Sequence, residues 1–243
     1  MLFKIVIPVY KSHLTENEIL SFNSVLRFYN TSHISLITPN RIDLPDIFKN
    51  VEQQKFDDAY FKNIMGYNSL LLSEKLYERF NNIDYILIHQ LDAFMFKKEL
   101  EHWCSKGYDY IGAPWLTSAN ILYKIFKSKK LKKRQPIFNK VGNGGFSLRK
   151  IETFLNFFKT NADVIEEFKN HELYGIEDVF WSLIAPKHQE FKIPDYNEAA
   201  KFCIDRKPEL GLKLNNGQLP FGCHGFEKSK TKPFWQKHIK DLK

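Results

Sequence analysis

The chain has 243 residues, 43% of them hydrophobic and 22 of them phenylalanine, which is enough for one large α/β domain or two small ones. Its formal net charge of +8 favours an anionic partner such as a nucleotide, an acidic glycan, a phosphorylated lipid, a membrane surface or nucleic acid. Three widely spaced cysteines form neither a metal-binding pair nor a disulfide framework, no apolar run could span a bilayer, and no signal peptide is evident. We therefore expect a cytoplasmic protein that is soluble or peripheral to a membrane.

The N-terminal part of the chain has the pattern of a strand, a helix and a second strand. Residues 3–9 form an apolar run of strand length, and residues 34–38 form a shorter one. Between them, residues 16–29 carry apolar side chains close to helical spacing, and Thr15 with Glu18 has the sequence of a capping box. These elements predict a compact βαβ unit with parallel strands.

Polar side chains follow two of the predicted strands. Tyr10 and Lys11 follow the first strand, and Asp92 follows the β-branched and aromatic run that opens residues 85–96. A run this apolar predicts a strand that is covered on both faces, and ligands of open α/β sheets lie beyond the carboxyl ends of the strands. Asp92 could therefore coordinate a metal ion or bind a ligand, although a lone Asp after a strand is as often a turn residue or helix cap.

The segments on either side of this strand are less distinctive. Residues 41–60 are mixed and are predicted to be a loop, whereas residues 67–80 have the apolar spacing of one helix. After Asp92, residues 98–106 are predicted to form a short helix. Residues 109–115 are predicted to form a short strand that enters a tight turn.

Residues 124–134 contain seven basic residues and no acid. Such a block is usually a solvated, mobile loop. A functional version would contact a polyanionic acceptor or an anionic membrane leaflet. Nucleic acid is not expected, because the chain contains no known nucleic-acid-binding module.

Residues 141–149 include three glycines in four positions, among them Gly144 and Gly145. These glycines allow the backbone to approach a ligand closely, although a bulge or hairpin turn would explain them as well. The spacing matches neither a Walker-type phosphate loop nor a dinucleotide fingerprint. A helix is predicted over residues 150–158.

Further polar groups lie in the C-terminal third. Adjacent Glu177 and Asp178 stand at the start of an apolar helix, where the helix dipole alone favours acids. Residues 191–200 are predicted to be irregular. Residues 220–225 are predicted to form a Gly-rich turn that carries His224, although most single histidines have only structural roles.

The order of these pieces resembles that of glycosyltransferases of the GT-A type. In that superfamily a first strand similar to residues 4–10 opens a nucleotide-binding half, and a central strand ends in an acidic motif similar to Gln90-Leu91-Asp92. A Gly-rich segment similar to residues 142–146 follows, then an acidic pair similar to Glu177-Asp178, and finally a histidine such as His224.

Four phrases more closely resemble those of a bacterial family of uncharacterised glycosyltransferase-like proteins. They are Gln-Leu-Asp-Ala-Phe, Tyr-Asp-Tyr-Ile-Gly-Ala-Pro-Trp, Gly-Asn-Gly-Gly-Phe-Ser-Leu-Arg and Phe-Gly-Cys-His, within residues 67–224. The resemblance implies one GT-A-like α/β domain over residues 1–243. Its mixed, mostly parallel sheet would be flanked by helices and would include a Rossmann-like half. It further implies a nucleotide-sugar-binding half (1–115), a basic mobile loop (116–140) and an acceptor-side half (141–243).

The function implied is inverting transfer of a sugar from a nucleotide-diphosphate sugar, expected to be a UDP-sugar, to a glycan or lipid-linked acceptor. Its expected setting is bacterial surface polysaccharide synthesis at the inner face of the plasma membrane. By motif position, Asp178 is the expected catalytic base, and Glu177 is expected to position the acceptor or to bond to nearby backbone N–H groups. The residues expected to bind the donor are Tyr10, Lys11, Gln90, Asp92, Gly144 and Gly145.

The resemblance also implies a divalent cation, Mn²⁺ or Mg²⁺, held by Asp92 and His224. Gln90 stands where the superfamily commonly has a first Asp, and an amide is a poorer ligand for these ions than a carboxylate. A metal-independent enzyme therefore remains open, with basic residues neutralising the leaving diphosphate. Two other classes of function also remain open, namely an inactive nucleotide- or sugar-binding module and a basic scaffold for membrane or nucleic acid.

Overall fold

The computed structural model describes residues 1–117, 135–169 and 176–243. The strands are β1 (Phe3–Pro8), β2 (Ile34–Pro39), β3 (Glu52–Phe56), β4 (Tyr85–His89), β5 (Ala93–Met95), β6 (Tyr110–Gly112), β7 (Phe146–Lys150), β8 (Cys203–Ile204) and β9 (Gly222–His224). The helices are α1 (Glu16–Leu26), α2 (Ile64–Leu71), α3 (Glu74–Glu78), α4 (Leu100–Ser105), α7 (Ile151–Thr160), α8 (Ala162–Lys169), α9 (Glu177–Val179), α10 (Tyr196–Phe202), α11 (Pro208–Leu214) and α12 (Lys232–Trp235).

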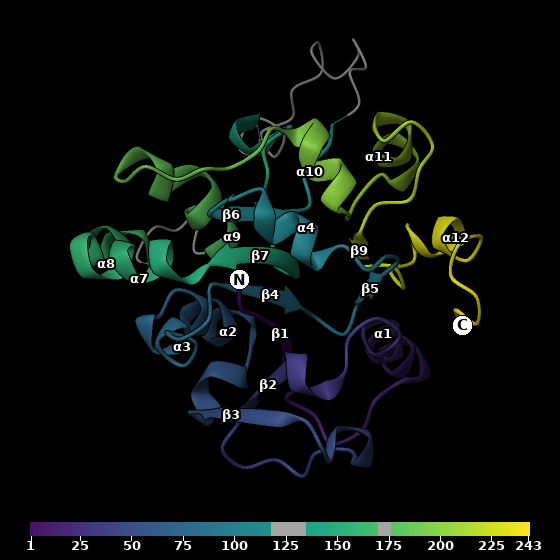
Figure 1. The fold of residues 1–243 in the computed structure, drawn as a ribbon, viewed down its shortest axis with the longest axis horizontal. Helices are drawn as coiled ribbons and strands as arrows, with labels where there is room; N and C mark the ends of the chain where they lie inside the picture. Colours follow the sequence, from purple (N-terminus) through teal and green to yellow (C-terminus); the bar gives the residue numbers. More distant parts are fainter. Residues whose placement is uncertain (118–134, 170–175) are drawn as a thin grey trace.

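A six-stranded sheet in the order β3-β2-β1-β4-β7-β6 forms the centre of the fold, and its strands follow one another from the lower part of Figure 1 upward. The pairs β3–β2, β2–β1 and β1–β4 are parallel, whereas β7 is antiparallel to both β4 and β6. All five residues of β4 are buried, as its apolar sequence predicted. The predicted mixed, mostly parallel sheet flanked by helices is therefore confirmed.

The predicted N-terminal βαβ unit is also confirmed. β1 and β2 are parallel neighbours, and α1 connects them. The Thr15 hydroxyl accepts a hydrogen bond from the backbone N–H of Glu18, and the Glu18 carboxylate accepts one from the backbone N–H of Thr15 at 2.8 Å. This capping box fixes where α1 begins, immediately after the polar residues that follow β1.

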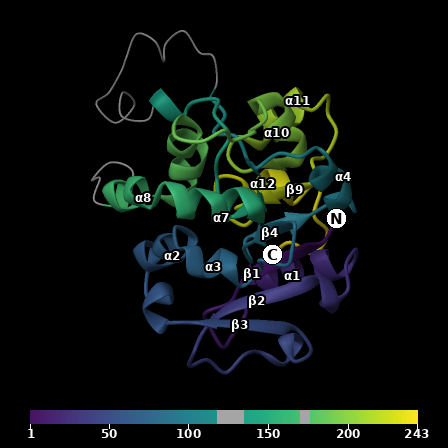
Figure 2. The same ribbon diagram turned by 60° about the vertical axis from the view of Figure 1, so that its left-hand side comes forward.

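A three-stranded sheet in the order β5-β9-β8 lies beside the carboxyl end of β4 (Figures 1 and 2). Two serine hydroxyls of α1 bind its edge strand β5: Ser21 donates to the carbonyl of Ala93, and Ser24 accepts from the N–H of Met95. In the β5–β9 register Ala93 pairs with His224. The residue before β5, Asp92, is thereby brought next to the last residue of β9.

Two predictions for the first half of the chain are wrong in detail. Residues 52–56 of the predicted loop form β3, a largely exposed strand at the sheet edge that lacks apolar alternation because it covers little core. The helix predicted over residues 67–80 is two helices. The Asn63 side chain caps α2 three residues earlier than predicted, and the Ser73 side chain caps α3 after a break.

Two predictions for the second half also need correction. Within residues 191–200, predicted to be irregular, α10 begins at Tyr196 because the Asp195 carboxylate accepts hydrogen bonds from the next turn. The predicted Gly-rich turn at residues 220–225 contains the buried strand β9. Gly222 permits this strand because the ring of Phe146 occupies the space that a Cβ atom would need.

The predicted membrane contact through residues 124–134 concerns a segment outside the described residues. Most of the predicted loop over residues 116–140 is outside them as well. Among the helices that the structure describes, none has both the length and the apolar character needed to cross a bilayer.

His89, the last residue of β4, is a buried polar group that the sequence analysis did not single out. Its side chain is fully buried beside the ring of Phe146. Neither ring nitrogen has a hydrogen-bond partner within the described part of the chain. Burial lowers the pKa of His89 from 6.5 to about 4, so the folded protein holds this imidazole neutral.

We therefore expect acid to destabilise the fold through His89. Between pH 6.5 and about 4 the unfolded chain binds this proton and the folded chain does not, so stability falls as the pH drops through that window. The variant His89→Leu lacks this titrating group. Its free energy of unfolding, relative to that of the unaltered protein, should therefore rise by up to about 3 kcal/mol as the pH falls from 7 to 4. Urea unfolding at several pH values measures the difference. The exposed His238→Leu serves as control, and a difference that does not change with pH would refute the assignment.

Candidate active site

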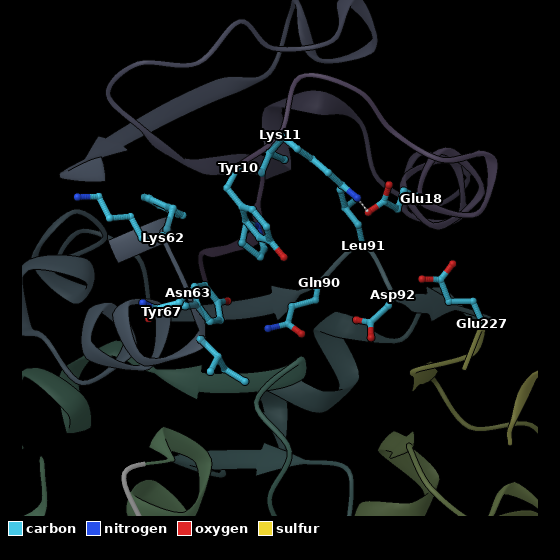
Figure 3. Close-up of a pocket in the computed structure, with 14 residues that line it drawn as sticks. Tyr10, Lys11, Glu18, Lys62, Asn63, Tyr67, Gln90, Leu91, Asp92 and Glu227 are labelled. Carbon is cyan, nitrogen blue, oxygen red and sulfur yellow. Dashed lines mark ion pairs between the residues drawn. The ribbon is translucent and has the colours of Figure 1, made fainter. Parts of the chain in front are cut away.

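A cavity of about 460 Å³ opens at the carboxyl ends of β1 and β4. Tyr10 and Lys11 line it from the end of β1, Gln90 and Asp92 line it from the end of β4, and Tyr67 lines it from α2. Figure 3 shows these side chains around one open space, with Glu227 on the far side of Asp92. The cavity occupies the position where open α/β sheets bind ligands.

Tyr10 and Lys11 both lie on the wall of this cavity, but their environments differ. The Tyr10 side chain is 57% exposed, and its ring lies 6.4 Å from that of Phe61. The Lys11 ammonium forms an ion pair with the carboxylate of Glu18, drawn as a dashed line in Figure 3. Lys11 therefore has to share or exchange this partner if it binds a phosphate.

His224 brings together polar groups from three parts of the chain. Its Nε2 atom lies 3.0 Å from Oδ1 of Asp92 and 3.2 Å from Oε1 of Gln90. Its Nδ1 atom lies 3.2 Å from Oδ1 of Asp205. The ammonium of Lys228 lies 3.3 Å from the other oxygen of Asp92, so two carboxylates and two cationic groups alternate here.

The alternation of charge shifts the pKa values of both site residues. Burial by itself raises the pKa of Asp92, but His224 and Lys228 outweigh it and hold that pKa below its usual range. Burial by itself lowers the pKa of His224, but Asp92 and Asp205 raise it to about 9. The two carboxylates therefore favour the protonated form of the His224 ring.

Gly144 and Gly145 approach these groups so closely that no side chain would fit. A Cβ atom at Gly145 would overlap the His224 ring and would lie 2.7 Å from Oε1 of Gln90. A Cβ atom at Gly144 would lie 2.7 Å from Oε2 of Glu177. The backbone carbonyl of Gly145 also accepts a hydrogen bond of 2.8 Å from the N–H of Gln90. Two adjacent glycines therefore contact the two groups of polar residues: Gly145 contacts the His224 cluster, and Gly144 contacts the acidic pair.

Glu177 and Asp178 have different environments although they are adjacent. Glu177 is 2% exposed, and its carboxylate lies 2.6 Å from the buried guanidinium of Arg149. Asp178 is half-buried: Oδ2 accepts a hydrogen bond of 3.3 Å from the N–H of Gly144, and Oδ1 makes none of standard geometry with the described residues. Burial raises the pKa of each carboxyl group; the Arg149 guanidinium opposes the rise for Glu177, and the N–H of Gly144 opposes it for Asp178.

The described residues include no group of three His, Cys, Asp or Glu side chains arranged to hold a metal ion. Asp92 and His224 nevertheless offer a carboxylate oxygen and an imidazole nitrogen 3.0 Å apart. Neighbouring ligands of an octahedral Mg²⁺ or Mn²⁺, each about 2.1 Å from the ion, are also separated by about 3 Å. The two residues fit such an ion, with water or diphosphate oxygens as the remaining ligands.

The sequence analysis missed several residues of this site. Asp205 and Arg149 are buried partners of His224 and Glu177, and Lys228 contacts Asp92. Arg149 ends the Gly-rich phrase but received no role, and Lys228 belongs to a lysine-rich C-terminal segment that resembles solvated surface. No sequence signal pointed to Asp205, because the strand before it has only two residues.

Comparisons with known proteins identify a family and a fold. The family model described as "Protein of unknown function (DUF5672)" matches residues 50–224. No match is found among curated proteins.

Several solved glycosyltransferases have a similar structure. The galactosyltransferase LgtC, in complex with donor and acceptor sugar analogues, superposes with a TM-score of 0.55 at 13% identity, covering 97% of this chain and 90% of LgtC. Mouse xyloside xylosyltransferase 1 gives 0.52 at 10% identity over 92% and 97% of the two chains. A glycosyltransferase involved in glycosylation of the PBCV-1 major capsid gives 0.51 at 10% identity over 99% of each chain. The predicted GT-A fold class is therefore confirmed.

The close contact at Gly145 generates a testable expectation. In Gly145→Ala the added methyl group overlaps the His224 ring, so the ring or the glycine segment has to move. Overpacking of this kind typically costs about 1–3 kcal/mol of stability. Thermal unfolding measures the loss. The control is Gly217→Asn, because no atom lies within 4 Å of a Cβ placed at Gly217. A Gly145→Ala variant as stable as the unaltered protein would contradict the assigned contact.

Proposed function

The chain belongs to the DUF5672 family, and we propose that it is a glycosyltransferase that moves a sugar from a nucleotide-diphosphate sugar, first of all a UDP-sugar, to a glycan or glycolipid acceptor. The observation that carries this proposal is the meeting of Asp92, His224 and Asp178 around two glycines, beside a cavity at the carboxyl ends of the strands. The motif resemblance supports bacterial surface polysaccharide synthesis, on the inner face of the plasma membrane, as the setting.

In this proposal the donor occupies the cavity between β1, β4 and α2. The exposed ring of Tyr10 stacks on the base or ribose, because its face is available to a planar ligand. Lys11 moves from Glu18 to the diphosphate, for which its ammonium is a suitable partner. Gln90 lines the cavity and borders the donor sugar, and Gly144 and Gly145 lie directly behind it, where the carbonyl of Gly145 accepts a hydrogen bond from the N–H of Gln90.

Asp92 and His224 would hold the divalent cation of this proposal, through Oδ1 and Nε2. When bound, Mn²⁺ or Mg²⁺ supplies positive charge next to the leaving diphosphate. The ammonium of Lys228 contacts the other oxygen of Asp92, so it can stabilise negative charge from a second side.

Asp178 is the proposed catalytic base. It takes the proton of the acceptor hydroxyl, whose oxygen forms a bond to the anomeric carbon of the donor sugar. The bond from that carbon to the diphosphate oxygen breaks at the same time, and the nucleoside diphosphate leaves with the electron pair. The attack comes from the face opposite the leaving group, so the product has the inverted configuration. Glu177 is held by Arg149, which favours a positioning role for it.

This assignment predicts the effect of removing one carboxylate. Asp178→Asn should lower the rate of transfer by about 10²–10⁴, as loss of a general base typically does, while donor affinity stays within a few-fold. The removed oxygen makes no strong structural contact, so the thermal stability should change little. Single-turnover transfer and calorimetry with UDP measure rate and affinity, and NMR of the product gives its anomeric configuration.

The control is Glu152→Gln, which removes an exposed acid from the first turn of α7 and should leave the rate unchanged. Near-normal transfer by Asp178→Asn, or a product that retains the configuration of the donor, would overturn the assignment of the base.

A further inference from the structure

Asp205 is a buried carboxylate that contacts His224 from the side opposite Asp92. It follows β8, which runs parallel to β9 with Ile204 paired to Cys223, so the next residues along the two strands, Asp205 and His224, are neighbours. Asp205 is 4% exposed. Its position is therefore fixed by backbone pairing within the small sheet and not by a flexible loop.

Each oxygen of Asp205 accepts from a different side chain. Oδ1 lies 3.2 Å from Nδ1 of His224, and Oδ2 accepts a hydrogen bond of 2.9 Å from Nδ2 of Asn143. Asn143 has a left-handed backbone with a φ of 60°, and its own side-chain oxygen accepts from the N–H of Gly145 at 3.2 Å. A carboxylate cannot donate, so His224 must carry its Nδ1 proton toward Asp205.

We propose that Asp205 is a positioning residue of the metal site, which fixes His224 with Nδ1–H donated to Asp205 and with Nε2 directed at the ion beside Asp92. This inference rests on the metal ligands assigned under the proposed function. Metal-binding histidines commonly donate their second N–H to a carboxylate, which sets the orientation of the ring and strengthens the ligand nitrogen.

Asp205 also joins the metal ligand to the glycine segment. Through Asn143 it holds the turn whose next residues, Gly144 and Gly145, border Asp178 and His224 respectively. One carboxylate thus sets the relative positions of the histidine ligand and the segment that contacts the proposed base.

An amide cannot replace this carboxylate, although it has the same shape. In the variant Asp205→Asn the side chain would have one acceptor oxygen for two donors, so it could serve either Asn143 or His224 but not both. If the oxygen faces Asn143, the NH₂ group faces Nδ1 of His224 and makes that nitrogen an acceptor. The ring proton then lies on Nε2, where it blocks the metal.

The test is titration of Mn²⁺ alone into the full chain, with free Mn²⁺ followed by electron paramagnetic resonance. Asp205→Asn should lower the affinity for Mn²⁺ by about 10–100-fold, as the loss of such hydrogen-bond partners of a ligating histidine typically does. The reciprocal double variant, Asn143→Asp with Asp205→Asn, exchanges carboxylate and amide and again gives each donor its own acceptor. It should restore the affinity to within a few-fold of that of the unaltered protein.

Asp109→Asn is the matched control. Asp109, the residue before β6, is a buried carboxylate that lies away from the site and accepts from the Thr153 hydroxyl and from the N–H of Lys192. Its substitution should alter the unfolding temperature without altering the affinity for Mn²⁺. Because the double variant keeps both hydrogen bonds, it should fold even if Asp205→Asn does not.

Three results would overturn the inference. Unchanged Mn²⁺ affinity in Asp205→Asn would refute it and leave the proposed metal ligands intact. A folded double variant that does not bind Mn²⁺ would refute the hydrogen-bond pattern as the cause. No binding of Mn²⁺ by the unaltered protein would refute both the metal site and the role of Asp205, whereas sugar transfer without a metal would still support the proposed function.

Discussion

The candidate site depends on one imidazole held between two carboxylates. Asp92 follows a strand of the large sheet, whereas His224 ends β9 and Asp205 follows β8 of the small sheet, so their ion pairs join the two sheets where the cavity opens. Each of these groups is largely or fully buried, and a buried charge that loses its partner is strongly destabilising. The charges therefore stabilise the contact between the sheets only when all three groups are present. The same arrangement places Asp92 and His224 close enough together to bind one ligand.

A second buried ion pair, between Arg149 and Glu177, has a complementary role. Arg149 lies on β7 and is fully buried; its guanidinium also donates to the hydroxyl of Tyr77 at 2.8 Å and to Ser147. Because Glu177 forms this ion pair, the start of α9 is fixed against the sheet, and Asp178 is held beside the N–H of Gly144. The two adjacent acids thus have different roles: Glu177 stabilises the start of the helix, and Asp178 is available as the proposed base.

Local sequence patterns predicted much of the fold because several elements carry their own signals. The capping box at Thr15 and the apolar run of β4 predicted α1 and the central strand. By contrast, β3 is a polar edge strand, and β8 and β9 have two and three residues, so their positions depend on neighbours distant in sequence. Asp205 could not be predicted for the same reason, because only the β8–β9 register brings it to His224. The acids and glycines of the site could be named from motif order, but their hydrogen-bond partners could not.

The central claim is that this chain transfers a sugar from a nucleotide-diphosphate donor. The most direct measurement is release of free nucleoside diphosphate from a panel of nucleotide sugars, with and without Mn²⁺ and with glycan acceptors present. The account predicts release from one donor class, UDP-sugars first, stimulated by Mn²⁺ and by an acceptor. Binding of nucleotides without release from any donor would contradict it and would instead indicate an inactive nucleotide-binding module.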